Sequence, residues 1–136
     1  MTELLKSLDI SASGMRAQGT RLRVISENVA NAGSTALEPG GEPYRRKLVT
    51  FGSTLNRQLG AELVNVRRIS RDPSPFGLRY QPSHPAADAN GYVKISNVDT
   101  MIEMADMREA QRSYEANLRV LQTSRTMLER TIDLLR

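Results

Sequence analysis

Apolar side chains at both ends of the chain recur with the period of a helix. In residues 1–34 they are spaced seven apart, at Met1, Leu8, Met15, Leu22 and Val29, with Leu4 and Ile25 at intervening positions. In residues 98–136 steps of three and four alternate over a longer stretch, at Met104, Met107, Tyr114, Leu118, Leu121, Leu128, Ile132 and Leu135, interrupted only by Gln111 and Arg125. This pattern predicts two long helices, each with an apolar seam of the coiled-coil type.

The middle of the chain has the residue types that are typical of turns and short strands. All six prolines lie between residues 39 and 85, and neither glycine nor proline occurs after Gly91. β-Branched and aromatic residues predict strands at 47–51, 62–69, 76–80 and 91–95. Residues 53–60 fit either a helical turn or a flexible loop.

The predicted fold class is therefore mainly α. We expect residues 1–34 and 98–136 to be the N- and C-terminal helices of a coiled-coil-like inner core domain, and residues 35–97 to be a loop and a small β-rich middle region. A helix over residues 98–136 would be close to about 58 Å long, whereas a compact chain of this length has a radius of gyration of about 14 Å. The helices are too long for a compact globule of this mass.

Two ways of covering the seams are open. The helices can pair within one chain as a hairpin that is stable alone, or copies and partner chains can complete them, in which case the free ends should be largely disordered before assembly. For the second case we expect these subunit-packing residues: Leu8, Met15, Leu22, Ile25, Val29, Met107, Tyr114, Leu118, Leu121, Leu128, Ile132 and Leu135.

Two glycines lie inside the predicted N-terminal helix. Gly14 and Gly19 would each cost about 1 kcal/mol relative to alanine. Either close packing of a neighbouring helix offsets that cost, or the helix begins only after Gly14 with Ser13 as its N-cap. The sequence leaves both open.

Composition and charge exclude several classes of protein. Hydrophobic residues make up 39% of the chain but aromatic ones only 4%, so we expect a thin aliphatic core. No apolar run approaches the roughly 18 residues that cross a bilayer, and the charges in "MTELLKSLDI" argue against a cleavable signal peptide. The chain has no cysteine, which excludes disulfides and cysteine-ligated metals.

Nothing in the sequence has the pattern of a catalytic, cofactor or metal site. His84 is the only histidine and lies in a predicted turn, where a structural role is favoured, and no glycine-rich segment matches a phosphate-binding loop. The net charge of +4 belongs to the middle, where Arg45, Arg46, Lys47, Arg67, Arg68, Arg71 and Arg79 could attract a polyanion. A nucleic-acid-binding protein is therefore the alternative from another class, although no predicted helix carries a basic recognition face.

Both ends of the chain resemble one known family. "ASGMRAQGTRLRVISENVANAGST" at residues 12–35 resembles the opening signature of the axial proteins of the bacterial flagellum, the rod and hook family. Residues 91–135 resemble the closing helix of that family, most distinctively at Ser113, Tyr114, Glu115, Ala116 and Asn117. "GGEPYRRKLVTF" and residues 72–98 resemble the short proximal rod subunits. Ser96 departs from their usual proline, so another rod paralogue is the alternative within the family.

The resemblance implies a structural subunit of the proximal rod, the drive shaft that crosses the periplasm and transmits motor torque, with no catalysed reaction and no cofactor. It implies export by the flagellar type III export apparatus without a cleavable signal peptide. The implied partners are copies of the chain, other proximal and distal rod proteins, the basal-body adaptor at the export gate and the rod-capping muramidase. It implies no nucleic acid and no membrane span.

The end of the N-terminal helix is the last candidate site. Asparagine is a poor helix former because its amide competes for backbone hydrogen bonds, so Asn28 and Asn31 near an apolar stripe need a role. We expect Asn31 or Gly33 to take the left-handed conformation that closes a helix, and Asn28 to bond to backbone or to an adjacent subunit. This helix end would then join the helical layer to the β-rich middle.

Overall fold

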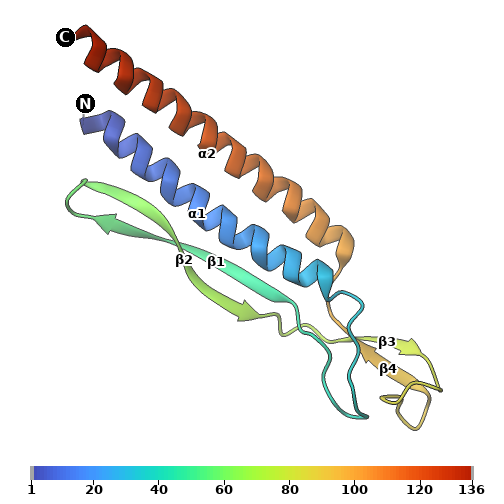
Figure 1. Cartoon of the computed structure of the whole chain (residues 1–136). Helices are drawn as coiled ribbons and strands as arrows, with labels where there is room; N and C mark the ends of the chain where they lie inside the picture. Colours follow the sequence, from blue (N-terminus) through green and yellow to red (C-terminus); the bar gives the residue numbers. More distant parts are fainter. Residues whose placement is uncertain (1, 136) are drawn as a thin grey trace. The chain divides into compact units, whose positions relative to one another are not determined.

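The computed structural model describes residues 2–135 and contains two long helices separated by four strands (Figure 1). In chain order these are α1 (Thr2–Ala30), β1 (Lys47–Asn56), β2 (Ala61–Arg71), β3 (Gly77–Tyr80), β4 (Tyr92–Ile95) and α2 (Thr100–Leu134). β1 pairs with β2 and β3 with β4, so the middle holds two two-stranded antiparallel sheets. Long terminal helices around a small β-containing middle are confirmed. Met1, the first position of the predicted seam, and Arg136 lie outside the described residues.

The chain folds as two compact units that share both helices and the β1–β2 hairpin. The first contains the described residues through Leu22, Thr50–Arg68, and the part of α2 from Arg108 onward; the second contains Arg23–Val49 and Ile69–Met107. The predicted segments 1–34, 35–97 and 98–136 divide the chain along its sequence, and that division stays a prediction.

In the first unit, α1 runs through both glycines without a break, so the alternative in which the helix begins after Gly14 is wrong. Ser13 is not an N-cap: its hydroxyl donates to the carbonyl of Ile10 (2.7 Å) and accepts the backbone N–H of Val64 in β2 (3.2 Å). A Cβ added at Gly14 would lie 2.8 Å from Nδ2 of Asn117 in α2, whereas one at Gly19 would meet no atom within 4 Å. Close packing thus explains Gly14 and leaves Gly19 unexplained.

Residues 53–60, whose structure the sequence leaves open, belong to the β1–β2 hairpin. β1 continues to Asn56, so the first half of the segment is strand. A four-residue turn follows, closed by the N–H of Gly60 donating to the carbonyl of Asn56 (2.8 Å), so the second half is a single helical turn. The Asn56 side chain accepts the backbone N–H groups of Gln58 (3.1 Å) and Leu59 (3.3 Å), and Gly60 closes the turn with φ near 63°. Asparagine followed by a left-handed glycine is turn chemistry that fixes the hairpin register.

In the second unit, β3 and β4 pair antiparallel from Gly77↔Ile95 to Tyr80↔Tyr92 over a very small core of Ala36, Ala86 and Val93. This agrees with the expectation of a thin aliphatic core. Among the described residues, no helix combines the length and the hydropathy needed to span a bilayer.

Candidate helix-end junction and packing surfaces

The end of α1 is closed by backbone turns. Neither Asn31 nor Gly33 has a positive φ, so the predicted left-handed closure is wrong. Instead the N–H of Ala32 donates to the carbonyl of Val29 (3.3 Å), and the Asn31 side-chain amide donates to the carbonyl of Glu27 (2.8 Å). Tightened turns and one side-chain amide satisfy the carbonyls of Glu27, Asn28 and Val29 without a left-handed residue.

Asn28 is the centre of a buried hydrogen-bond network in the second unit. Only 1% of its surface is exposed. Its Oδ1 accepts the hydroxyl of Tyr44 (2.8 Å) and the N–H of Lys47 (2.9 Å), while its Nδ2 donates to the carbonyl of Lys47 (2.9 Å) and to Oε2 of Glu103 (3.1 Å). These four bonds use the whole capacity of an amide side chain. Asn28 therefore ties the end of α1 to the start of β1 and to the first turn of α2.

Glu103 and Arg46 form the charged half of this network. Glu103 is 1% exposed, and its second oxygen, Oε1, accepts Nε–H of Arg46. Arg46 also faces Asp72 (3.4 Å) and Asp106 (3.5 Å), so three carboxylates surround one guanidinium. Burial disfavours the charged form of Arg46, but its hydrogen bonds and ion pairs with Glu103 and Asp72 outweigh burial and raise its pKa. We call Asn28, Tyr44, Arg46, Lys47 and Glu103 the junction.

One further ion pair and a hydrogen-bonded carboxylate border the junction. Lys47 Nζ lies 2.8 Å from Oε2 of Glu27, and this hydrogen bond lowers the pKa of Glu27 and raises that of Lys47. Hydrogen bonds from the hydroxyl and the N–H of Ser74 lower the pKa of Asp72. Burial raises the pKa of the Tyr44 hydroxyl. The carboxylates of Glu27 and Asp72 are thus held in their charged forms.

Sequence reasoning found Asn28 but missed its partners. In the sequence, Arg46 and Lys47 belong to the basic residues that could attract a polyanion, and no pattern there gives a role to Tyr44 or Glu103. A signal was present for Glu103: it lies seven residues before Ala110, on the same face of α2 as Asn117 and Ser124. An acidic residue on a line of small side chains predicts a buried carboxylate that needs a partner.

Contact between the two helices in the first unit uses small and polar side chains. The hydroxyls of Ser7 and Ser124 lie 3.1 Å apart, Gly14 faces Asn117, and Ala110 is fully buried. These positions are spaced seven apart on each helix, so they form one line of contact. The line lies beside the predicted seam and not on it.

The predicted packing residues consequently differ in burial. Ile25 is buried, and Ile132 and Leu135 are exposed. The others are half-buried: Leu8, Met15, Leu22, Val29, Met107, Tyr114, Leu118, Leu121 and Leu128. An open groove of about 410 Å³ lies beside three of these residues, and we call it the helix groove. It is lined by Met15, Tyr114 and Leu121 together with Ala12, Arg16 and Gly19. The unexplained Gly19 is therefore on the wall of an apolar groove.

Residues proposed for other functions make internal contacts. The Arg45 guanidinium donates to the carbonyls of Asp72 (2.9 Å) and Ser74 (3.0 Å) and lies 4.2 Å from the centroid of the Phe76 ring. With Arg46 and Lys47 in ion pairs, part of the basic middle is neutralised within the chain. His84 accepts the N–H of Ala86 at Nδ1 (3.0 Å) and lies 3.3 Å from the Thr35 hydroxyl at Nε2, which is a structural role.

Comparison with known proteins places the chain in one family. Residues 89–134 match the family model described as flagellar basal body rod FlgEFG protein C-terminal. The chain is 52% identical over 136 residues to the flagellar basal-body rod protein FlgC of Agrobacterium fabrum, covering 100% of this chain and 98% of the relative. It is 44% identical to FlgC of Yersinia enterocolitica (96% of this chain, 97% of the relative) and 40% identical to FlgC of Bacillus subtilis (94% and 95%).

These matches decide between the alternatives. These relatives are all named as one rod protein, FlgC, and each match covers nearly the whole of both chains. Neither another rod paralogue nor a nucleic-acid-binding protein is therefore favoured. Structural rod proteins are not known to be enzymes, which agrees with the absence of a catalytic pattern in the sequence. The chain belongs to the FlgC family of flagellar basal-body rod proteins and is a structural subunit of that rod.

Proposed function

We propose that this chain is built into the cell-proximal part of the rod through apolar surfaces on α1 and α2, and that it transmits torque there. One observation carries the proposal. In the first unit the contact line between the helices is occupied by Ser7, Gly14, Asn117 and Ser124, while the aliphatic and aromatic side chains beside it stay half exposed. In a chain that is stable as a monomer, the largest apolar side chains are expected on the line of contact between its own two helices.

Neighbouring helices are the natural cover for the helix groove. Covering a half-exposed side chain such as Tyr114 or Leu121 contributes about 1 kcal/mol or more. Gly19 lets a neighbouring backbone approach closely, which would offset its cost inside α1. Under this proposal the segments 1–34 and 98–136 together make a coiled-coil-like inner layer whose seams are completed between subunits.

The junction is the proposed path of torque through the subunit. A fully bonded Asn28 and the ion pair of the buried Glu103 with the half-buried Arg46 fix the end of α1 and the start of α2 against the first residues of β1. Every polar group of Asn28 would have to lose its partner before the helix end could turn independently. A load applied to the helices would therefore be transmitted to the β-containing middle with little relative motion at the junction.

The finer assignments of partners and place are part of the same proposal. We propose contacts with copies of the chain, other proximal and distal rod proteins, the basal-body adaptor at the export gate and the rod-capping muramidase. We propose a periplasmic position, reached through the flagellar type III export apparatus. The support is the resemblance of both chain ends to the axial family and the identity to full-length FlgC relatives.

Electron microscopy of basal bodies from a strain lacking the gene tests the proposal. We expect inner-membrane rings without a rod, restored by the wild-type gene. Leu121→Asp, in the helix groove, should fail to restore the rod, whereas the matched control Gln122→Asp, at the exposed neighbouring position, should restore it. Complete rods in the deletion strain would contradict the proposal.

A further inference from the structure

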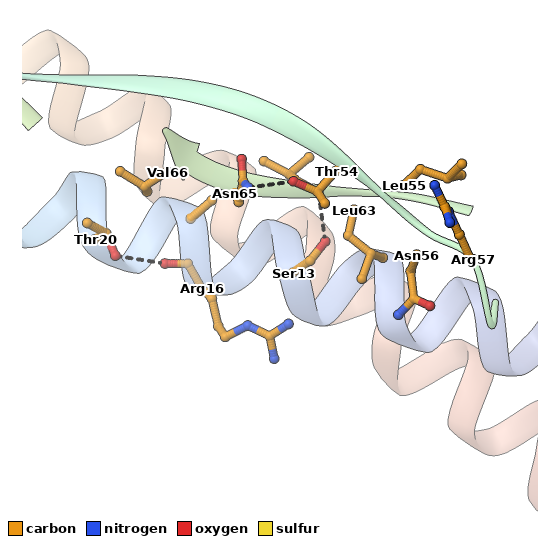
Figure 2. A pocket seen from close by; sticks show the side chains of 12 residues that line it. Ser13, Arg16, Thr20, Thr54, Leu55, Asn56, Arg57, Leu63, Asn65 and Val66 are labelled. Atoms are coloured by element: carbon orange, nitrogen blue, oxygen red, sulfur yellow. Dashed lines mark hydrogen bonds between the residues drawn. The ribbon is translucent and has the colours of Figure 1, made fainter. Parts of the chain in front are cut away.

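A second groove in the first unit lies between α1 and the β1–β2 hairpin, and Figure 2 shows the side chains around it. Its volume is about 630 Å³. The lining residues come from one helix face and from both strands: Ser13, Arg16, Ala17, Thr20, Thr54, Leu55, Asn56, Arg57, Leu63, Val64, Asn65 and Val66. We call this the hairpin groove. Of its lining residues only Arg16 also lines the helix groove.

The hairpin groove has a definite chemistry. Apolar groups on its walls include the buried Ala17 and the side chains of Leu63 and Val66. Arg16 on α1 and Arg57 in the hairpin turn are its charged residues, and no carboxylate lines it. Such a site suits an apolar side chain flanked by negative charge.

The second unit presents a segment with the complementary chemistry. Leu37 is 90% exposed, the highest exposed fraction of the large hydrophobic side chains in the described residues. Glu38 and Glu42 follow it in the chain and are both exposed, and Glu42 lies 3.6 Å from the Arg45 guanidinium without being buried by it. We call residues 36–42 the Leu37 turn. It combines one apolar tip with two carboxylates.

The Leu37 turn is held in place by its own backbone. Ala36 is buried in the small core with Ala86 and Val93, which anchors the start of the turn. The N–H of Gly41 donates to the carbonyl of Glu38 (3.0 Å), and Gly40 has a φ of 80°, which glycine adopts without strain. An exposed leucine on a fixed turn is prepared for binding because little conformational entropy remains to be lost.

We propose that the Leu37 turn of one copy binds in the hairpin groove of the next copy, with Glu38 and Glu42 facing Arg16 and Arg57. The contact is heterologous, because two different surfaces of the same chain meet. Heterologous contacts that do not close into a ring propagate as an open helical array, which is the assembly a rod requires. The inference deepens the proposed function, on which it rests, by assigning one of the contacts between copies.

The absence of cysteine allows a direct test. The chain has no cysteine, so Leu37→Cys together with Leu55→Cys places one thiol on the turn and one on the groove. At high protein concentration under mild oxidation we expect a ladder of disulfide-linked multimers. The matched control pairs Leu55→Cys with Met101→Cys, a strongly exposed apolar residue of the second unit outside the Leu37 turn, and should give no ladder. Monomers without a ladder, or equal ladders from both pairs, would overturn the proposal.

Charge exchange supplies the second test. Glu38→Arg with Glu42→Arg should reduce the yield of Leu37–Leu55 cross-links by roughly tenfold, because like charges then meet in the groove. Adding Arg16→Glu and Arg57→Glu should restore the yield. Circular dichroism of each variant shows whether it remains folded, and a reduction without restoration in folded protein would count against the pairing of these charges.

Failure of this contact and failure of the proposed function are distinguishable. The cysteine pair can also be oxidised in basal bodies isolated from a complemented strain. If the variant enters the rod but no multimers form, the contact is wrong and rod membership stands. If the wild-type chain is absent from isolated rods, the proposed function itself is wrong.

Discussion

Replacing Asn28 with alanine should uncouple the end of α1 from the junction. The substitution removes four hydrogen bonds and leaves their partners behind: the Tyr44 hydroxyl, both backbone groups of Lys47 and Oε2 of Glu103. An unsatisfied buried polar group costs about 1–3 kcal/mol. Tyr44 and Lys47 are only half-buried, so water can replace part of the loss there. Glu103 is fully buried and bears most of it.

Counting about 2 kcal/mol for the carboxylate and about 1–2 kcal/mol for the rest, we expect Asn28→Ala to lose about 3–4 kcal/mol of junction stability. That is more than a hundredfold in the equilibrium between a docked and an undocked helix end. Asn31→Ala is the matched control, because Asn31 makes one side-chain bond, to the carbonyl of Glu27, and should lose only about 1 kcal/mol.

Soft-agar expansion of complemented deletion strains measures the consequence, with an immunoblot to show that each variant is produced. We expect Asn28→Ala to reduce swimming severely and Asn31→Ala to reduce it slightly. Denaturant unfolding of the purified variants, where they fold, should show the same order. Wild-type swimming by Asn28→Ala, or equal defects from both substitutions, would refute the role of the junction.

Four other substitutions test the junction and the helix packing. Glu103→Gln removes the buried carboxylate that faces the half-buried Arg46 guanidinium, which keeps Asp72 and Asp106 as partners. It should destabilise the protein by about 1–3 kcal/mol in urea unfolding, and an unchanged midpoint would contradict the importance of the pair. Gly14→Ala should be neutral or destabilising by about 1 kcal/mol, because the added Cβ would lie 2.8 Å from Nδ2 of Asn117 and displacing that amide offsets the gain in helix propensity. An added Cβ at Gly19 meets no atom within 4 Å, so Gly19→Ala should raise the helicity of the free chain and still impair rod assembly. A higher thermal midpoint for Gly14→Ala than for Gly19→Ala would be inconsistent with the packing. Hydrogen bonds from Ser74 lower the pKa of Asp72. The stability that the Asp72 carboxylate contributes is therefore present above its ordinary pKa of 3.8 and is lost as the pH falls through the lowered value. In acid titrations, the free energy of unfolding of Asp72→Asn should depend less on pH than that of the wild type.

Long periodic segments were the part of the fold that the sequence specified best. The seven-residue spacing of apolar side chains predicted both helices, because the pattern extends over many turns and admits no strand. Which face of α2 is buried could not be predicted, because the contact line is set by small residues such as Ala110 and Ser124 that carry no hydropathy signal. Close approach of backbones depends on the shape of two surfaces, and one sequence pattern describes only one of them.

The candidate site shows the same limit. Asn28 was detectable because an asparagine among apolar positions is anomalous, but its partners come from residues 16 to 75 positions away in the chain. The left-handed closure at Asn31 or Gly33 was a statistical preference of helix ends, and here i→i−3 backbone turns replaced it. The length of β1 was underestimated because Gly52 and the polar residues after it interrupt the apolar pattern while the strand continues to Asn56.

Hydroxyl-radical footprinting of the helix groove tests the central claim, that neighbouring subunits cover the apolar surfaces beside the contact line. The oxidation of Met15 and Tyr114 would be compared by mass spectrometry between the purified chain and isolated basal bodies. Our account predicts strong protection of both side chains in the assembled rod. Equal reactivity of the two side chains in the free chain and in the rod would contradict it.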